Sequence, residues 1–251
     1  MNETELFVTS GDGVKISIRH CRGGKKAAVV IAPGFFTGKD TRTYRRLEGD
    51  LKDVFDVVSM DFRGHGRSEG RYAYSAKEKE DLKAVIGYAR DSGHKKIGVL
   101  GFSYGGAIAI LEAAEYKDVD SLVCAGSPMA SGEIEFKWWT WEGLKLGLWR
   151  WERGKGVRSG NPFLAKVRPL DVVASVSPIP ILFIHGTGDP TVDVRHSRML
   201  YEAAREPKAI KIFEKGSHAE EIYRRFPAEF IQTVKEWFGK TLEEGAVSVY
   251  N

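Results

Sequence analysis

Short apolar runs alternate with longer stretches of helical periodicity along most of the chain. Residues 14–18 alternate between apolar and polar side chains, which predicts a half-exposed strand near a sheet edge. Five runs are apolar almost throughout, as in strands that helices cover on both faces: 27–32, 55–60, 97–100, 121–125 and 181–184. Residues 210–213 are a further expected strand. Helices are expected between them, at about 41–51, 76–92, 104–116, 194–205 and 228–239. This order predicts an α/β fold with a mostly parallel sheet and helices on both faces.

The alternation of strands and helices breaks once, after Pro128. Residues 129–178 contain no clear strand and hold five of the six tryptophans, and the strand pattern resumes at residue 179. We therefore expect one core domain formed by residues 1–128 and 179–251, with residues 129–178 inserted between two of its strands.

Composition excludes several classes of protein. With 42% hydrophobic and 29% charged residues, the chain is too apolar and too evenly charged to be disordered, and two cysteines cannot build a disulfide scaffold. No apolar run approaches the length of a membrane span, and the acidic N-terminus lacks the apolar region of a secretory signal. The net charge is +4, with basic residues that occur singly, which argues against nucleic acid as a partner. A soluble, cytoplasmic protein is expected.

The most specific chemical signal is the pentapeptide Gly101-Phe102-Ser103-Tyr104-Gly105. It directly follows one expected strand and directly precedes an expected helix. A Gly-x-Ser-x-Gly sequence in this setting is typical of a nucleophile elbow, in which a serine sits on a strained turn above the sheet. The alternative is a glycine-rich turn with an incidental serine. We expect Ser103 to be a nucleophile.

A serine hydroxyl needs a base, and six histidines are available. His218 lies in a short loop directly after the strand 210–213, at the carboxyl end where parallel sheets place catalytic groups. His20 is set aside because it lies in the half-exposed strand, and His94 because it follows a helix in a surface loop. His218 is the predicted base.

The histidine in turn needs a carboxylate that orients its ring. Asp189 follows the strand 181–184, again at a carboxyl end. Asp193 is the rival, but it precedes a helix and looks more like a capping residue. The resulting chain order of serine, aspartate and histidine differs from that of the trypsin-like and subtilisin-like proteases.

An oxyanion intermediate also needs backbone donors. One is expected to be the N–H of Tyr104, directly after the nucleophile, and the second the N–H of Phe35, with Phe36 as the alternative. A plain Pro-Gly turn at residues 33–34 is the competing interpretation of the second loop.

Four motifs together resemble the α/β-hydrolase superfamily over nearly the whole chain. They are the elbow and three loops: Asp61-Phe62-Arg63-Gly64-His65-Gly66-Arg67-Ser68, the acid loop at 185–190, and Gly216-Ser217-His218. Within that superfamily the chain looks most similar to small serine esterases and to acylglycerol-lipase-like, serine-aminopeptidase-like and cinnamoyl or feruloyl esterase-like hydrolases. The resemblance implies an eight-stranded sheet with an antiparallel second strand and a cap after strand six, which makes residues 129–178 the cap. It also implies structural roles for Asp61 and His65.

The tryptophans of the inserted segment allow three interpretations. Packing of the cap onto the core domain is the first, since aromatic side chains dominate small cores. The second is an apolar acyl pocket beside Ser103, formed by Trp138, Trp141 and Trp149 together with Phe36. A homo-oligomer that associates through the tryptophan-rich cap is the third.

The resulting hypothesis is a serine hydrolase that cleaves carboxylic esters of small to medium acyl groups through an acyl-enzyme, without cofactor or metal. Its partner would be a small-molecule ester. A thioesterase or an aminopeptidase-like amidase with the same triad is the nearest alternative, and a non-catalytic ligand-binding protein is a further one. Nucleotide binding is disfavoured because Ser103 stands where Gly-x-Gly-x-x-Gly requires its second glycine.

Overall fold

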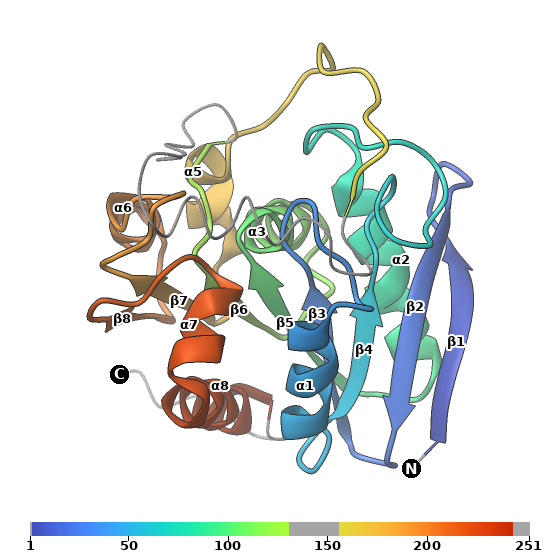
Figure 1. The fold of residues 1–251 in the computed structure, drawn as a ribbon, viewed down its shortest axis with the longest axis horizontal. Coiled ribbons are helices and arrows are strands. Elements are labelled where there is room, and N and C mark those ends of the chain that lie inside the picture. Colours follow the sequence, from blue (N-terminus) through green and yellow to red (C-terminus); the bar gives the residue numbers. More distant parts are fainter. Residues whose placement is uncertain (1, 131–155, 243–251) are drawn as a thin grey trace.

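An eight-stranded sheet forms the centre of the molecule, in a computed structural model that describes residues 2–130 and 156–242 (Figure 1). The strand order is β1-β2-β4-β3-β5-β6-β7-β8. The strands are β1 Asn2–Thr9, β2 Lys15–Arg22, β3 Ala27–Ala32, β4 Asp56–Met60, β5 Lys96–Phe102, β6 Ser121–Ala125, β7 Ile181–Gly186 and β8 Lys208–Phe213. All neighbours from β4 to β8 are parallel, whereas β2 is antiparallel to both β1 and β4. The predicted fold class is confirmed, including the antiparallel second strand.

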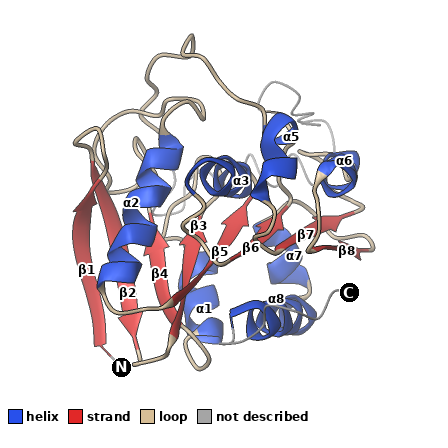
Figure 2. Ribbon diagram, turned by 180° about the vertical axis from the view of Figure 1, so that it is seen from behind, coloured by secondary structure: helices blue, strands red, loops and turns tan. Residues whose placement is uncertain are grey.

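Helices cover both faces of this sheet, as the two opposite views show (Figures 1 and 2). One face carries α1 Arg42–Leu51, α7 Glu220–Arg225 and α8 Pro227–Leu242, and the other carries α2 Glu78–Asp91, α3 Tyr104–Tyr116, α5 Pro169–Val172 and α6 Arg195–Ala203. Two separate apolar cores result, one on each side of the sheet. The continuous apolar runs of the central strands follow from this arrangement, because both of their faces are buried.

The edge of the sheet differs from the expectation. β2 was predicted to be half exposed, but its residues from Ile16 to Cys21 are all buried. β1, whose polar sequence escaped prediction, pairs with the whole length of β2. The charged side chain of Arg19 is accommodated because Glu48 of α1 and Asp40 form ion pairs with it. Burial of a polar position is possible here because a charged partner is supplied from another element.

The chain between β6 and β7 is described in part. Residues 131–155, with Trp138, Trp141 and Trp149, lie outside the described residues, so the cap and its tryptophans stay predictions. Where the description resumes, Arg158 N donates to Gly64 O over 2.8 Å and Tyr72 N donates to Arg158 O over 2.9 Å. This part of the predicted insertion therefore lies against the loop after β4. None of the helices in the described ranges has the length and apolar content that a membrane crossing requires.

Candidate active site

Ser103 lies on the sharp turn that joins β5 to α3. Its backbone has φ 49° and ψ −116°, a conformation that residues with a Cβ rarely adopt. The turn is held from both sides, because Ser103 N donates to Ala125 O of β6 over 2.7 Å and Ser103 O accepts from Gly106 N over 3.1 Å. The surrounding sheet and helix thus keep a strained serine above the carboxyl end of β5.

The glycines of the turn are required by close backbone approaches. A Cβ on Gly105 would stand 2.2 Å from Ala32 O at the end of β3 and 2.5 Å from Pro33 O in the loop that follows. On Gly101 it would stand 2.5 Å from the Cα of Gly106. No side chain fits at such distances, so the packing of α3 against β3 and β5 depends on these glycines.

The structure brings Ser103, His218 and Asp189 together from three different loops. His218 Nε2 lies 2.8 Å from Ser103 Oγ, and His218 Nδ1 lies 2.7 Å from Asp189 Oδ2. The loops follow β5, β7 and β8, whose carboxyl ends meet at one edge of the sheet because these strands are parallel. All three residues are buried. The result is a continuous line of polar contacts from a carboxylate through an imidazole to a serine hydroxyl.

The carboxylate of Asp189 is held by its own loop and by a second histidine. Asp189 Oδ1 accepts from Thr191 N over 2.8 Å and from Val192 N over 2.9 Å. His185 Nε2 lies 3.2 Å from Asp189 Oδ2 and 2.9 Å from Val192 O. A carbonyl oxygen only accepts, so Nε2 of His185 carries a proton that it also presents to Asp189. This contact was missed in the sequence, where His185 was only part of the acid loop.

Asp193, the rival carboxylate, serves a different purpose. Its Oδ1 accepts from Arg195 N, the first residue of α6, over 2.9 Å. It therefore acts at the start of a helix, as its sequence position suggested.

The electrostatic surroundings of Asp189 and His218 favour a negative charge on the aspartate and a positive charge on the histidine. Burial alone would raise the pKa of Asp189, but the nearby His218 and hydrogen bonds from both histidines hold it well below its usual range. Burial alone would lower the pKa of His218, but the Asp189 carboxylate outweighs it, and the His218 pKa is raised. Glu220, next to the histidine loop, adds to this rise. Asp189 is thus an anion poised to stabilise an imidazolium at His218.

The loop after β3 approaches Ser103 directly. A Cβ on Gly34 would lie 3.5 Å from the Cβ of Ser103, and Gly34 N donates to Tyr44 Oη over 3.0 Å. Among the described residues, no backbone carbonyl accepts from the amide of Phe35 or from that of Tyr104. Both amides therefore remain candidates for an oxyanion hole. Phe36 is half buried and has a φ of 69°.

The remaining family-like loop plays a supporting part. Asp61 is buried and accepts from Lys39 N over 2.7 Å and from Arg67 N over 3.0 Å. His65 lies edge-on to the ring of Phe35, with centroids 5.8 Å apart. Both contacts order the loops around the site, in keeping with the structural roles expected for Asp61 and His65.

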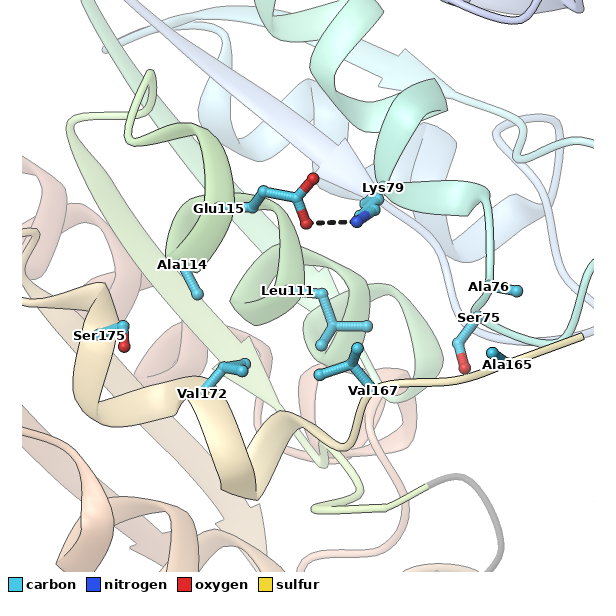
Figure 3. A pocket seen from close by; sticks show the side chains of 10 residues that line it. All are labelled: Ser75, Ala76, Lys79, Leu111, Ala114, Glu115, Ala165, Val167, Val172 and Ser175. Carbon is cyan, nitrogen blue, oxygen red and sulfur yellow. Dashed lines mark hydrogen bonds and ion pairs between the residues drawn. The ribbon is translucent and has the colours of Figure 1, made fainter.

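A second hollow lies away from this line of residues. It opens between α2, α3 and the chain from Ala165 to Ser175, and Leu111, Val167 and Val172 project toward it beside the ion pair of Lys79 and Glu115 (Figure 3). Of the predicted site residues that the structure describes, none lines it. Its position on the outer side of α3 separates it from the turn at Ser103.

Comparison with known proteins identifies the fold that carries these features. A family model described as the alpha/beta hydrolase fold matches residues 27–150. Together with the observed strand order, this match shows that the chain has the α/β-hydrolase fold.

Individual relatives and structures agree with this assignment. The chain is 29% identical to the uncharacterised protein YqkD of Bacillus subtilis (strain 168), over 94% of this chain and 81% of YqkD. It is 23% identical to the serine hydrolase BPHL of Mus musculus, over 86% of this chain and 80% of that protein. Among solved structures, the Pyrococcus furiosus esterase Pf2001 superposes with a TM-score of 0.78 at 23% identity, over 96% of this chain and 94% of the esterase.

Proposed function

We propose that this protein is a serine hydrolase that cleaves carboxylic esters of small to medium acyl groups. The observation that carries the proposal is the line Asp189–His218–Ser103, with contacts of 2.7 Å and 2.8 Å, at the edge of the sheet where parallel strands end. The presence of an esterase and a serine hydrolase among the similar proteins supports the same reaction class.

The first half of the reaction follows from the proton positions in this line. Ionised Asp189 only accepts, so His218 Nδ1 carries the ring proton and Nε2 is free to accept the proton of Ser103 Oγ 2.8 Å away. Ser103 Oγ then attacks the ester carbonyl carbon. The negative charge that forms on the carbonyl oxygen would be stabilised by the N–H groups of Phe35 and Tyr104.

In the second half of the reaction, His218 first returns the proton that it accepted and then accepts another from water. The imidazolium of His218 donates its Nε2 proton to the departing alcohol, which leaves the acyl group on Ser103. A water molecule then transfers a proton to His218 Nε2 and attacks the acyl carbon. Collapse of the second tetrahedral intermediate releases the carboxylic acid, and the proton returns from His218 to Ser103 Oγ.

Acyl preference is assigned to the predicted cap at 129–178. Trp138, Trp141 and Trp149, together with Phe36, would supply the apolar surface that receives the acyl chain. Single Trp→Ala variants that remain folded should change selectivity between short and long acyl chains. An unchanged ranking in all three variants would contradict this assignment.

The function is tested with a graded panel of substrates and a pair of serine variants. p-Nitrophenyl esters from acetyl to long-chain acyl groups, thioesters and aminoacyl p-nitroanilides are offered to the wild type, to Ser103→Ala and to Ser175→Ala, an exposed serine on the far side of α3. We expect ester turnover in the wild type and in Ser175→Ala, and a loss of about 10⁶-fold in Ser103→Ala. Faster turnover of thioesters or amides would move the protein to another reaction class. No turnover of any substrate would favour a binding protein.

A further inference from the structure

Three buried, metal-ligating side chains meet at the opposite end of the sheet from Ser103. His20 belongs to β2, Asp56 is the first residue of β4, and His94 lies in the loop between α2 and β5. The amino end of β4 lies far from the carboxyl ends that carry the line of Ser103, as the strand directions show (Figure 1). The cluster is therefore separate from the proposed esterase site.

One potential ligand atom of each residue lies within 4.8 Å of the others. His94 Nε2 is 3.1 Å from Asp56 Oδ2, and His20, Asp56 and His94 are only 2%, 1% and 4% exposed. Tetrahedral ligands at about 2.0–2.1 Å from a zinc ion stand roughly 3.3 Å apart, which the contact between His94 and Asp56 already matches, and the 4.8 Å limit on the cluster requires His20 to move inward by at most roughly 1.5 Å. The sequence predicts His20 in a half-exposed strand and His94 on the surface; both predictions are wrong, because α2 packs on them through Tyr88 and Ala89.

Each of the three side chains is oriented by a second contact. His94 Nδ1 donates to Ala89 O over 3.0 Å, and Nε2 donates to Asp56 Oδ2 over 3.1 Å, so a metal ion would take the place of the Nε2 proton. Asp56 Oδ1 accepts from Gly23 N over 2.7 Å, so that Oδ2 remains available. His20 Nδ1 lies 3.1 Å from Tyr88 Oη. Outer contacts of this kind fix the tautomer and ring direction of metal-binding histidines.

The remaining ring nitrogen of His20 supplies an independent observation. Its Nε2 is buried and has no hydrogen-bond partner among the residues that the structure describes. A buried polar atom without a partner lowers the stability of the fold unless something else satisfies it. A cation between the three side chains would satisfy this atom and would replace the proton that His94 Nε2 shares with Asp56.

We propose that His20 Nε2, Asp56 Oδ2 and His94 Nε2 bind one divalent transition-metal ion, with zinc the preferred one. Two imidazoles and a carboxylate match the ligand preferences of zinc, and a water completes a four-coordinate shell. Because the ligands come from two strands and a loop, the ion acts structurally and joins β2 and β4 to the end of α2. The proposal differs from the sequence-based expectation of a protein without metal.

The first test measures metal binding by the full-length protein after removal of metal with a chelator. The His218→Ala variant is used as the parent, so that the histidines beside Ser103 do not contribute a competing site. Titration calorimetry with zinc should give about one ion per chain, and thermal unfolding should move to higher temperature with added zinc. Cobalt(II) should show the visible absorption of a tetrahedral complex. Absence of saturable zinc uptake would overturn the proposal and leave a simple ion pair between His94 and Asp56.

The second test assigns the ligands with matched variants in the same parent. His20→Gln should abolish stoichiometric zinc uptake, and Tyr88→Phe, which removes only the outer contact, should weaken it by about 10–100-fold. His65→Gln is the control, because His65 is also a buried histidine whose Nε2 has no described hydrogen-bond partner, but it lies outside the cluster. Equal zinc affinity in His20→Gln and His65→Gln would refute the assignment. Should His20→Gln fail to fold, Tyr88→Phe and the cobalt spectrum decide the question.

Discussion

Replacement of Gly105 by alanine tests the proposed link between the packing of α3 and the chemistry at Ser103. The added Cβ would stand 2.2 Å from Ala32 O and 2.5 Å from Pro33 O. Both are backbone atoms of the chain that leads to Phe35, so they cannot turn aside as a flexible side chain would. The loop or the helix must move.

The magnitude follows from the cost of overpacking a filled interior. An inserted methyl group of this kind costs about 2–3 kcal/mol of unfolding free energy. In a chain of this size that corresponds to a fall in Tm of roughly 4–12 °C. The shift of the loop also displaces the amide of Phe35, and loss of one oxyanion donor reduces kcat by about 10²–10³-fold.

Gly87 provides the matched control, because it is a helical glycine whose added Cβ would meet nothing within 4 Å. Gly87→Ala should therefore stabilise the fold by about 0.5–1 kcal/mol through helix propensity alone and leave kcat unchanged. Urea unfolding and p-nitrophenyl ester turnover are measured on both variants. Equal stability of the two variants, or wild-type turnover in Gly105→Ala, would refute the reasoning.

Three further predictions concern titratable groups. Asp189→Asn should lower kcat by about 10⁴-fold with an unchanged circular dichroism spectrum, because the amide no longer fixes the tautomer of His218, and a loss below tenfold would contradict this. The rate constant kcat/KM falls as His218 is protonated, and because the pKa of His218 is raised, this fall should occur at a pH above the usual histidine range. Glu220→Gln should move the fall to lower pH. An unchanged position would exclude the contribution of Glu220. The carboxyl oxygens of Glu112 are buried and have no hydrogen-bond partner among the described residues. Burial and the nearby Asp118 raise the pKa of Glu112, so the folded protein retains a proton that the unfolded chain loses as the pH rises. Glu112→Gln should therefore gain stability over the wild type increasingly from acidic to alkaline pH in urea unfolding, and a pH-independent difference would count against it.

The central strands were predictable because their burial on both faces leaves long apolar runs in the sequence. β1 was not, since its residues are mostly polar and its strand conformation depends on pairing with β2. The burial of β2 was missed for a related reason, because the ion pair of Arg19 with Glu48 is formed between residues far apart in the chain. Short α7 has too few residues to show a helical period.

The site shows the same division between local and tertiary signals. Ser103, Asp189 and His218 each follow an expected strand, so their loops could be placed at one edge of the sheet from the chain alone. The contact of His185 with Asp189 and the approach of Glu220 to the loop at Gly34 depend on how these loops fold back, which no local pattern encodes. The cluster of His20, Asp56 and His94 likewise forms only when separate elements assemble.

The most direct test of the proposed function is covalent labelling of the nucleophile with a fluorophosphonate. Mass spectrometry of the wild type should show about one label per chain, carried by the peptide that contains Ser103, with a labelling rate that falls as His218 is protonated. Ser103→Ala should take up no label, while Ser175→Ala should label like the wild type. Label on another residue, or an unlabelled wild type that is correctly folded, would contradict the assignment of Ser103 as the nucleophile of a serine hydrolase.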